Sequence, residues 1–357
     1  MRIVVVGGSG NVGSALLAVL REDADASVVA VARRTPSTRP PKPYDRAQWE
    51  PVDLAVPGPD EPVVERLAGV FAGADAVVHL AWALQPTHRR DVLRRTNVDG
   101  TRRVLAAVAR ARVPHLVVAS SVGAYSPVDD DVPRAESWRT DGVRSSAYSV
   151  DKVAVERLLD EAEQRATGLL VARVRPALIF QGRAGSAIER YFLGPLAPAA
   201  VLRHPLPLLP WPRGVRVQAV HAHDVARLYR EILVRGAAGA FNVAAADVLR
   251  AQDVADVVAE GRWAPVPVSA VRGAVAAAWH ARAVAVSPGW VDLARGVPLL
   301  DTTRAAAELG WSPRWSGQAA LAELVEGMAR GRGTASPVLR PRRRARRSVV
   351  GGQTDLR

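Results

Sequence analysis

Residues 1–13 constrain the fold of this chain more than any other stretch. An apolar run over residues 2–6 leads directly into three glycines, Gly7, Gly10 and Gly13, spaced three residues apart. A glycine turn between a strand and a helix lets backbone amides approach an anionic pyrophosphate at the positive end of the helix. A tight turn without a ligand is the alternative, and the setting favours the binding turn. Its residues are Gly7, Ser9, Gly10, Asn11, Val12 and Gly13.

Apolar runs alternate with helical patterns through the first half of the chain, which predicts a parallel sheet wound with helices. We expect strands over residues 2–6, 27–32, 75–81, 115–120 and 169–173, and helices over 12–22, 61–71, 89–112 and 147–166. The predicted fold class is therefore α/β, a doubly wound parallel sheet of the Rossmann type over residues 1–180.

After Pro176 the sequence becomes rich in proline, and shorter helical and strand patterns are mixed. This change predicts a smaller, interleaved C-terminal part over residues 181–330 that binds a substrate, with some return to the first domain near 215–245. Within this part we expect Asp224 to cap a helix that ends at Arg235, and Thr302 or Thr303 to cap another.

Composition narrows the class of protein. A length of 357 residues, 48% of them hydrophobic and 23% charged, is typical of an ordered globular chain with about two domains. The absence of cysteine excludes disulfides, thiolate metal sites and a cysteine nucleophile. The net charge of +13 is uneven, because residues 331–357 contain eight arginines and one acid. We expect this basic segment to be a disordered tail. Its charge could attract nucleic acid, but we expect no nucleic-acid partner to be required for function.

The apolar stretch at the N-terminus is too short and wrongly flanked for a signal peptide, so we expect a cytoplasmic protein. The most apolar later stretch, residues 268–286, is interrupted by Arg272, His280 and Arg282. These side chains argue against a membrane span and favour a packed or interfacial helix.

Lys152 is one of only two lysines in a chain with 46 arginines, and it follows Tyr148 by four residues, which places both on one helix face. A cation about 4 Å from a phenolate stabilises it by roughly 4 kcal/mol at an effective dielectric constant of about 20. We therefore expect Lys152 to lower the pKa of Tyr148 by about 3, so that the phenol exchanges protons with an alcohol or ketone near neutral pH. A helix-surface pair with a half-buried phenol is the alternative.

Two arginines follow the second predicted strand, where dinucleotide folds distinguish NAD from NADP. An acid about 20 residues beyond the glycines binds the ribose 2′-hydroxyl, whereas an arginine there accepts a 2′-phosphate. Ala32 stands at this point and is followed by Arg33 and Arg34, and a guanidinium binds phosphate bidentately. We expect NADP(H) to be preferred over NAD(H); two ordinary surface arginines are the alternative.

Further motifs follow the glycine turn in a fixed order along residues 1–330. They are Asp53-Leu54, His79-Leu80-Ala81, Asn97-Val98-Asp99-Gly100-Thr101, Ser120-Ser121, the Tyr148/Lys152 pair, Arg175-Pro176 and Val220-His221. In these motifs the chain resembles the extended branch of the short-chain dehydrogenase/reductase superfamily, the NAD-dependent epimerase/dehydratase family.

The resemblance implies a role for each matching residue. Tyr148 would be the general acid/base, Lys152 the cation that binds the ribose and lowers the tyrosine pKa, and Ser121 the group that holds the substrate oxygen. The remaining cofactor-binding residues that it implies are Asp53 and Leu54 beside the adenine, then Leu80, Ala81, Ser120 and Pro176, with Asn97 as a brace.

Two departures from the family's motifs bear on the reaction. The sugar-nucleotide dehydratases of the family carry Asp-Glu directly after the catalytic hydroxyl residue, where this chain has Val122-Gly123, so we do not expect dehydration. Nucleotide-sugar epimerases tend to have Arg-Asp-Tyr where this chain has Val217-Gln218-Ala219. The substrate pocket should therefore be short of phosphate partners, unless Arg216 takes that role.

Aromatic and apolar side chains dominate the expected substrate pocket, which suits a hydrophobic carbonyl or alcohol. The candidates are Trp82, Gln85, Phe180, Tyr191, Phe192 and Trp211, each of which could instead belong to the core. His221 and His223 beside Asp224 suggest a metal, but alternate residues of a strand point to opposite sides and no third soft ligand is nearby, so we expect none.

These features lead to one main hypothesis and two alternatives. The main hypothesis is an NAD(P)-dependent oxidoreductase that transfers hydride between NADP(H) and a ketone or secondary alcohol of a mostly apolar small-molecule substrate. A sugar or sugar-nucleotide epimerase is the second hypothesis, and a non-catalytic NADP(H)-sensing regulator is the third. A homodimer is expected only by analogy with the family.

Overall fold

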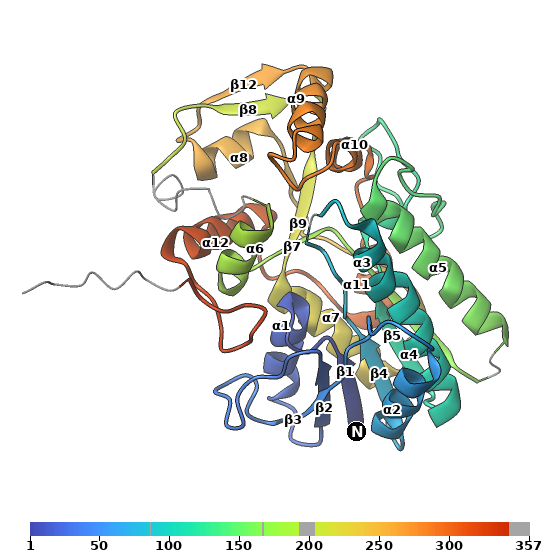
Figure 1. The fold of residues 1–357 in the computed structure, drawn as a ribbon. Coiled ribbons are helices and arrows are strands. Elements are labelled where there is room, and N and C mark those ends of the chain that lie inside the picture. The colour runs from blue at the N-terminus through green and yellow to red at the C-terminus, as the bar shows by residue number, and fades with distance from the viewer. Residues whose placement is uncertain (86, 166–167, 193–203, 343–357) are drawn as a thin grey trace, which may run out of the picture.

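The computed structural model describes residues 1–85, 87–165, 168–192 and 204–342. Its centre is a seven-stranded sheet with the order β10-β6-β5-β4-β1-β2-β3, in which every neighbouring pair is parallel (Figure 1). The strands are β1 (Arg2–Val6), β2 (Ser27–Ala32), β3 (Ala47–Pro51), β4 (Ala76–His79), β5 (His115–Ala119), β6 (Leu170–Pro176) and β10 (Gly239–Val243). The doubly wound parallel sheet predicted from the sequence is confirmed.

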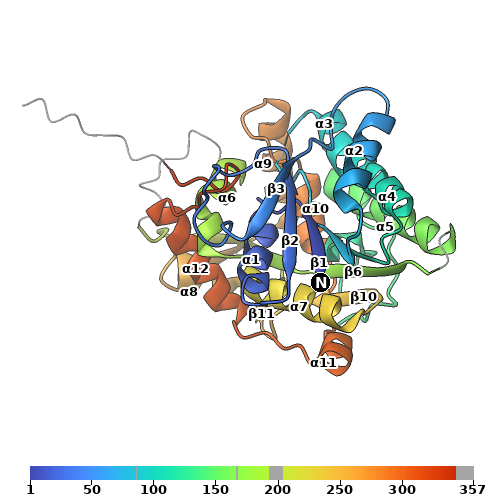
Figure 2. The same ribbon diagram turned by 90° about the horizontal axis from the view of Figure 1, so that it is seen from below.

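Alternate residues of the central strand β1 enter two separate cores. Ile3 and Val5 belong to one core, and Val4 and Val6 to the other. The first core contains residues of α1 (Asn11–Leu20), α7 (Ala222–Arg235) and α11 (Thr303–Leu309); the second contains residues of α2 (Glu61–Phe71), α4 (Gly100–Ala111) and α5 (Ala147–Arg165). A strand buried on both faces has no polar alternation, which is why residues 2–6 form a continuous apolar run. Figure 2 shows the helices around the sheet from below.

The element boundaries differ from the sequence predictions where polar residues or backbone irregularities intervene. Strands β1 and β2 and helix α2 match the predicted ranges residue for residue. The edge strand β3 has the sequence AQWEP and is only partly buried, so it left no apolar run to detect. The single helix expected over 89–112 is three segments, α3 (Arg90–Arg94), a π-helical turn η1 (Arg95–Asp99) and α4.

The second half of the chain builds a smaller part above the carboxyl ends of the large sheet (Figure 1). It contains a three-stranded sheet, a two-stranded sheet and five helices in the described residues. These are β7 (Leu178–Phe180), β9 (Val217–His221) and β11 (Val248–Leu249), then β8 (Leu209–Pro212) and β12 (Trp263–Val266), with α6 (Gly185–Phe192), α8 (Ala251–Val258), α9 (Val268–His280), α10 (Gly289–Gly296) and α12 (Gly317–Arg330). Helix α7 and strand β10 return to the large sheet.

Two helix caps differ from expectation. His221, not Asp224, is the N-cap of α7, and its side chain accepts the His223 amide at 3.2 Å. Asp224 lies in the first turn, where its carboxylate accepts the amides of Arg314 and Trp315 at 2.8 and 3.0 Å. Asp224 therefore links α7 to the loop that contains Arg314 and Trp315, and the N-cap of α7 is His221 instead. Helix α11 begins after Thr302, which makes no side-chain cap.

The basic C-terminal segment is packed as far as it is described. Residues 332–342, which we call the C-terminal strap, follow α12, and Ser336 and Leu339 within the strap are 0% and 2% exposed. The predicted disorder from residue 331 onward is therefore wrong for these residues, because hydroxyl and aliphatic side chains between the arginines find buried partners. Residues 343–357 lie outside the described residues.

The apolar stretch 268–286 contributes helix α9, which contacts α10 through an ion pair between Arg272 and Asp292 at 2.8 Å. Across the described part of the chain, every helix is too short or too polar to span a bilayer.

Candidate active site

A cavity of about 910 Å³ lies at the carboxyl ends of the central strands. Its walls come from the glycine turn after β1, the loops after β2, β4 and β5, helices α5, α6 and α10, and the C-terminal strap. Ligands of open α/β sheets bind at this edge, because the loops there surround a crevice between neighbouring strands.

The glycine turn is shaped by close backbone approach. Gly7 has φ +93°, and a Cβ there would lie 2.6 Å from the Ala81 amide nitrogen; a Cβ on Gly13 would lie 2.4 Å from the Gly7 carbonyl oxygen. No side chain fits at either position. The turn places the N-terminus of α1 in the cavity wall, and the vacant Cβ positions suit the cradle that a dinucleotide pyrophosphate needs.

The loop after β2 carries the residues that were expected near the adenosine end. Arg33 and Arg34 are exposed and line the cavity together with Asp53 and Leu54. The Asp53 carboxylate accepts the Ala55 amide at 2.9 Å, which fixes its own loop. Two guanidinium groups thus lie where a dinucleotide would present its adenosine ribose.

Tyr148 lies in the first turn of α5, and its ring packs between two tryptophans. The ring centroids of Trp82 and Trp290 are 5.8 and 5.3 Å from that of Tyr148. Burial raises the pKa of Tyr148 to about 12, against a hydrogen bond with Ser121 that lowers it. The expectation of a lowered tyrosine pKa is therefore wrong for this structure, because loss of hydration outweighs the hydrogen bond with Ser121.

Lys152 lies one turn further along α5 and is 2% exposed. Its Nζ donates to the Ala119 carbonyl at 2.8 Å and lies 3.4 Å from the centroid of the Trp82 ring. Burial lowers the pKa of Lys152 to about 7, against the charges of Glu156 and Asp151, which raise it. The indole and the carbonyl together replace part of the water that an ammonium group loses on burial.

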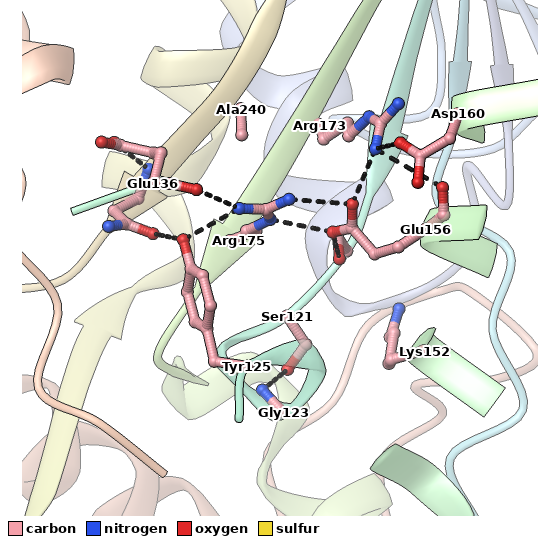
Figure 3. Close-up of polar contacts among 12 residues, drawn as sticks. Ser121, Gly123, Tyr125, Glu136, Lys152, Glu156, Asp160, Arg173, Arg175 and Ala240 are labelled. Atoms are coloured by element: carbon pink, nitrogen blue, oxygen red, sulfur yellow. Dashed lines mark hydrogen bonds and ion pairs between the residues drawn. The ribbon is translucent and has the colours of Figure 1, made fainter. Parts of the chain in front are cut away.

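Ser121 follows β5, and its hydroxyl lies near Gly123, as the Tyr148 ring does. The Gly123 amide donates to Ser121 Oγ at 3.0 Å, which fixes the short helix η2 (Val122–Ala124) beside the tyrosine (Figure 3). A Cβ on Gly123 would lie 2.9 Å from Cε1 of Tyr148. Gly123 therefore leaves the space that the ring occupies.

An ionic network lies behind these residues and was not predicted. Glu156, 1% exposed, accepts Ser120 Oγ at 2.5 Å and two nitrogens of Arg175 at 2.9 Å each, and it pairs with Arg173 at 3.0 Å (Figure 3). Burial opposes ionisation of Glu156, but the two arginines and Ser120 outweigh it and lower its pKa to about 2. In the sequence, only the spacing of Glu156, four residues after Lys152, could have indicated that it lies on the same helix face.

Residues 3–244 match the NAD dependent epimerase/dehydratase family. The chain belongs to this family.

Two proteins of Mycobacterium tuberculosis (strain ATCC 25618 / H37Rv) are similar to this family member in sequence. The uncharacterized protein Rv0501 is 25% identical over 280 residues, which cover 75% of this chain and 68% of Rv0501. The uncharacterized protein Rv2047c is 27% identical over 328 residues, which cover 91% of this chain but only 30% of Rv2047c.

Solved structures share the fold. MoeE5 in complex with UDP-glucuronic acid and NAD has a TM-score of 0.66 at 21% identity, with 92% of this chain and 99% of MoeE5 covered. The UDP-glucose 4-epimerase of Thermus thermophilus in complex with NAD also has a TM-score of 0.66, at 22% identity, with 93% of this chain and 99% of that chain covered. At these identities the likeness concerns the fold alone.

Most of the residues expected from the epimerase/dehydratase motifs line the one cavity. They are Gly7, Ser9, Gly10, Asn11, Val12, Gly13, Arg33, Arg34, Asp53, Leu54, Leu80, Ala81, Ser120, Ser121, Tyr148, Lys152 and Pro176, with Trp82, Gln85, Phe180, Tyr191 and Phe192. Asn97 lies behind the wall, where its side chain pairs with the amide and carbonyl of Ala83 at 2.7 and 3.2 Å. Trp211 is wrong as a pocket residue: it lies in β8 outside the cavity lining, and its indole nitrogen donates to the Val215 carbonyl at 3.0 Å.

The cavity wall also contains residues that the family motifs did not indicate. Trp290 of α10 stands between Tyr148 and Phe192, whose ring centroid is 5.7 Å away. Arg190, Arg216 and Arg340 also line the cavity, and the shortage of phosphate partners in the substrate pocket stays a prediction. Arg216 is already paired with Asp131 at 2.8 Å. The stretch around Trp290 gave no sequence signal, because it resembles an ordinary core helix, and Arg340 lies in the segment predicted to be a disordered tail.

No group of three or more metal-ligating side chains occurs in residues 1–85, 87–165, 168–192 and 204–342. The His221 ring binds Glu323 at 2.9 Å and stacks on Trp315 with centroids 4.3 Å apart. These contacts account for the histidine that had suggested a metal.

Proposed function

We propose that this member of the epimerase/dehydratase family is an NADP(H)-dependent oxidoreductase that interconverts a ketone and a secondary alcohol on a mostly apolar substrate. The observation that carries the proposal is the position of Tyr148 in the cavity. Tyr148 and Ser121 both lie next to Gly123 in the cavity wall. Tyr148 lies on the same helix face as Lys152, and its ring packs between Trp82 and Trp290.

The glycine turn would hold the pyrophosphate, and Lys152 would donate to the nicotinamide ribose hydroxyls. A bound reduced nicotinamide supplies the hydride. The hydroxyls of Ser121 and Tyr148 bind the substrate carbonyl oxygen, which orients the carbonyl carbon and polarises it. Because the pKa of Tyr148 is about 12, the phenol is protonated at neutral pH and can deliver its proton to the oxygen that gains charge during reduction.

The aromatic wall sets the expected substrate class. Trp82, Trp290 and Phe192 surround the tyrosine with ring faces and edges. Such a wall favours an apolar or ring-containing carbonyl compound, whose transfer from water is driven by the burial of apolar surface.

A panel of aliphatic and aromatic ketones incubated with NADPH tests the proposal. We expect loss of reduced-nicotinamide absorbance with wild type, and a decrease in kcat of at least about a hundredfold in Tyr148→Phe, as for the loss of a general acid. Tyr191→Phe is the matched control, since Tyr191 lines the same cavity without contacting Lys152 or Ser121 in the described contacts. Equal turnover by wild type and Tyr148→Phe would reject the proposed role of the tyrosine.

A second candidate is a sugar-nucleotide epimerase, which the three arginines in the cavity lining favour. Under this candidate Arg190, Arg216 and Arg340 would accept the diphosphate of a sugar nucleotide, such as those bound by MoeE5, instead of the pyrophosphate of the cofactor. An epimerase oxidises and re-reduces the same carbon, so it would retain its cofactor and cause no net absorbance change. Purified protein that carries a nicotinamide dinucleotide and isomerises a sugar nucleotide would establish this candidate over the first.

A further inference from the structure

The C-terminal strap is hydrogen-bonded to the glycine turn, directly at one point and through intervening hydroxyls at a second. Ser336 is fully buried, and its hydroxyl donates to the Ser9 carbonyl at 2.6 Å. The Tyr44 hydroxyl donates to Thr334 Oγ1 at 2.7 Å and lies 2.8 Å from Ser14 Oγ, which itself donates to the Gly10 carbonyl. A chain of hydroxyls thus joins the strap to the turn that would hold a pyrophosphate.

The other side of the strap is fastened to helix α6. Leu339 belongs to a small buried cluster with Ala184 and Ala187. The Arg190 guanidinium donates to the carbonyls of Val338 and Arg340 at 3.0 and 3.1 Å. The Arg342 amide donates to Ser186 Oγ at 3.1 Å, and the Arg342 side chain pairs with Glu189. The strap therefore bridges the dinucleotide domain and the substrate part.

The strap is also a wall of the candidate active site. Residues 337–340 line the same cavity as the glycine turn. Arg190 and Arg340 both reach this cavity and form no ion pair within the described ranges 1–85, 87–165, 168–192 and 204–342, whereas Arg342 is neutralised by Glu189. Two uncompensated guanidinium groups next to a glycine turn attract an anion, and they bind phosphate oxygens with charge-assisted hydrogen bonds.

We propose that residues 332–342 are part of the dinucleotide site, in which the strap closes over the pyrophosphate side of the cofactor and Arg340 and Arg190 add positive charge there. This inference rests on the proposed dinucleotide-dependent function. Strap docking and dinucleotide binding then stabilise each other, because each ligand of a coupled pair must raise the affinity for the other by the same factor. Cofactor release requires the strap to leave Ser9.

Hydrogen exchange of the intact chain with and without NADPH tests the coupling without any substitution. We expect amides of the glycine turn and amides of residues 332–342 to exchange more slowly together, by about tenfold or more, when NADPH is bound. Protection of the glycine turn alone would overturn the role of the strap and leave dinucleotide binding intact. Protection of neither segment would overturn the proposed function itself.

A matched pair of arginine substitutions tests the charge. Arg340→Ala should weaken NADPH binding about tenfold at low ionic strength, with a smaller effect at high salt, as for one lost charge-assisted contact. Arg330→Ala is the control, because Arg330 is an exposed arginine at the end of α12 that pairs with Glu326 outside the cavity. Equal NADPH affinities for the two variants would overturn the part assigned to Arg340.

Two shortened chains test the strap as a unit. A chain ending at Arg342 keeps the strap, and a chain ending at Gly331 lacks it. We expect NADPH to dissociate about tenfold faster from the shorter chain, since the buried hydroxyl contacts and the α6 contacts are lost. Equal dissociation rates would contradict the inference, and failure of the shorter chain to fold leaves the hydrogen-exchange comparison of the intact chain to decide.

Discussion

Lys152 shows how a functional group costs stability in this molecule. Its ammonium is buried, and burial lowers its pKa to about 7, below the value of about 10.4 of a free lysine. Between these two pH values the unfolded chain binds more protons than the folded one, so this group makes folding stability rise with pH over that range.

Lys152→Met should therefore stabilise the protein at acidic and neutral pH. Removal of the buried charge should raise the free energy of unfolding by at most about 5 kcal/mol. Loss of the hydrogen bond to Ala119 and of the contact with Trp82 should lower it by about 2 kcal/mol, so we expect a net increase of about 3 kcal/mol. The gain should be largest below about pH 7, reach zero near about pH 9 and become a loss of up to about 2 kcal/mol above about pH 10, as measured by urea unfolding across pH. Lys42→Met is the control, because Lys42 is the other lysine and is exposed. A gain that is constant with pH would contradict this explanation.

Arg33 and Arg34 carry the proposed preference for NADP(H). Each is exposed and lines the cavity, so removal should cost little stability. Arg33→Ala or Arg34→Ala should raise the Kd of NADPH about tenfold and leave that of NADH nearly unchanged, because only NADPH has a 2′-phosphate to bind. Fluorescence titration of both dinucleotides measures this, with Arg39→Ala as an exposed arginine outside the cavity lining. Equal losses for NADPH and NADH would refute the assignment.

The residue patterns in the sequence indicated the part of the cavity lining around the glycine turn and Tyr148, but not the part around Trp290 and the strap. The glycine turn and the Tyr148/Lys152 pair have fixed local spacing, which a single sequence records. Trp290 and the C-terminal strap reach the cavity only through tertiary packing, and their neighbours in sequence resemble core helices or a basic tail. The direction of the Tyr148 pKa was missed for the same reason, since burial is set by distant residues.

At the scale of elements, the apolar strands were predictable because both of their faces are buried, as β1 and β2 show. The polar edge strand β3 and the π-helical turn η1 were not. The turn interrupts a helical pattern without changing its composition, and within it Asn97 clamps Ala83 in the loop after β4. A π-helical turn changes the hydrogen-bonding pattern of the backbone, and the periodicity of apolar side chains does not reveal this change.

Helix α10 allows the substrate wall to be tested separately from the cofactor site. A Cβ on Gly289 would lie 2.1 Å from the Ser145 carbonyl oxygen, so Gly289→Ala must displace the start of α10 and Trp290 with it. We expect a decrease in kcat/KM of at least about tenfold for the carbonyl substrate, as for a misplaced positioning group, with unchanged NADPH affinity.

Gly273→Ala is the matched control for this change. Gly273 lies in α9 with nothing within 4 Å of its added Cβ, so alanine there should preserve kinetics and stabilise the helix by up to about 1 kcal/mol. Stopped-flow NADPH binding and steady-state kinetics compare the two variants. A Gly289→Ala enzyme that loses NADPH affinity and kcat/KM together would contradict the proposed division between α10 and the cofactor site.

At the scale of the whole molecule, segments from every part of the chain meet in one cavity. More than a hundred residues separate the glycine turn from Tyr148, and more than a hundred separate Tyr148 from Trp290. These residues and the C-terminal strap nevertheless line the same cavity. A ligand that fills this cavity contacts both the large sheet and the smaller part. It must therefore stabilise the folded chain as a whole, by an amount set by its concentration relative to its Kd.

Thermal unfolding with a set of ligands should consequently identify the occupant of each end of the cavity. At a hundredfold excess over its Kd, NADPH should stabilise the protein by about 2.7 kcal/mol, and Arg33→Ala should need about tenfold more NADPH for the same shift. Under the oxidoreductase proposal a sugar nucleotide added to the NADPH complex produces no further shift, because the rings of Trp82, Trp290 and Phe192 present mostly apolar surface to a hydroxylated sugar. A further shift that disappears in Arg190→Ala would instead show that Arg190 binds the diphosphate of the sugar nucleotide, and the epimerase would become the better explanation of the same cavity.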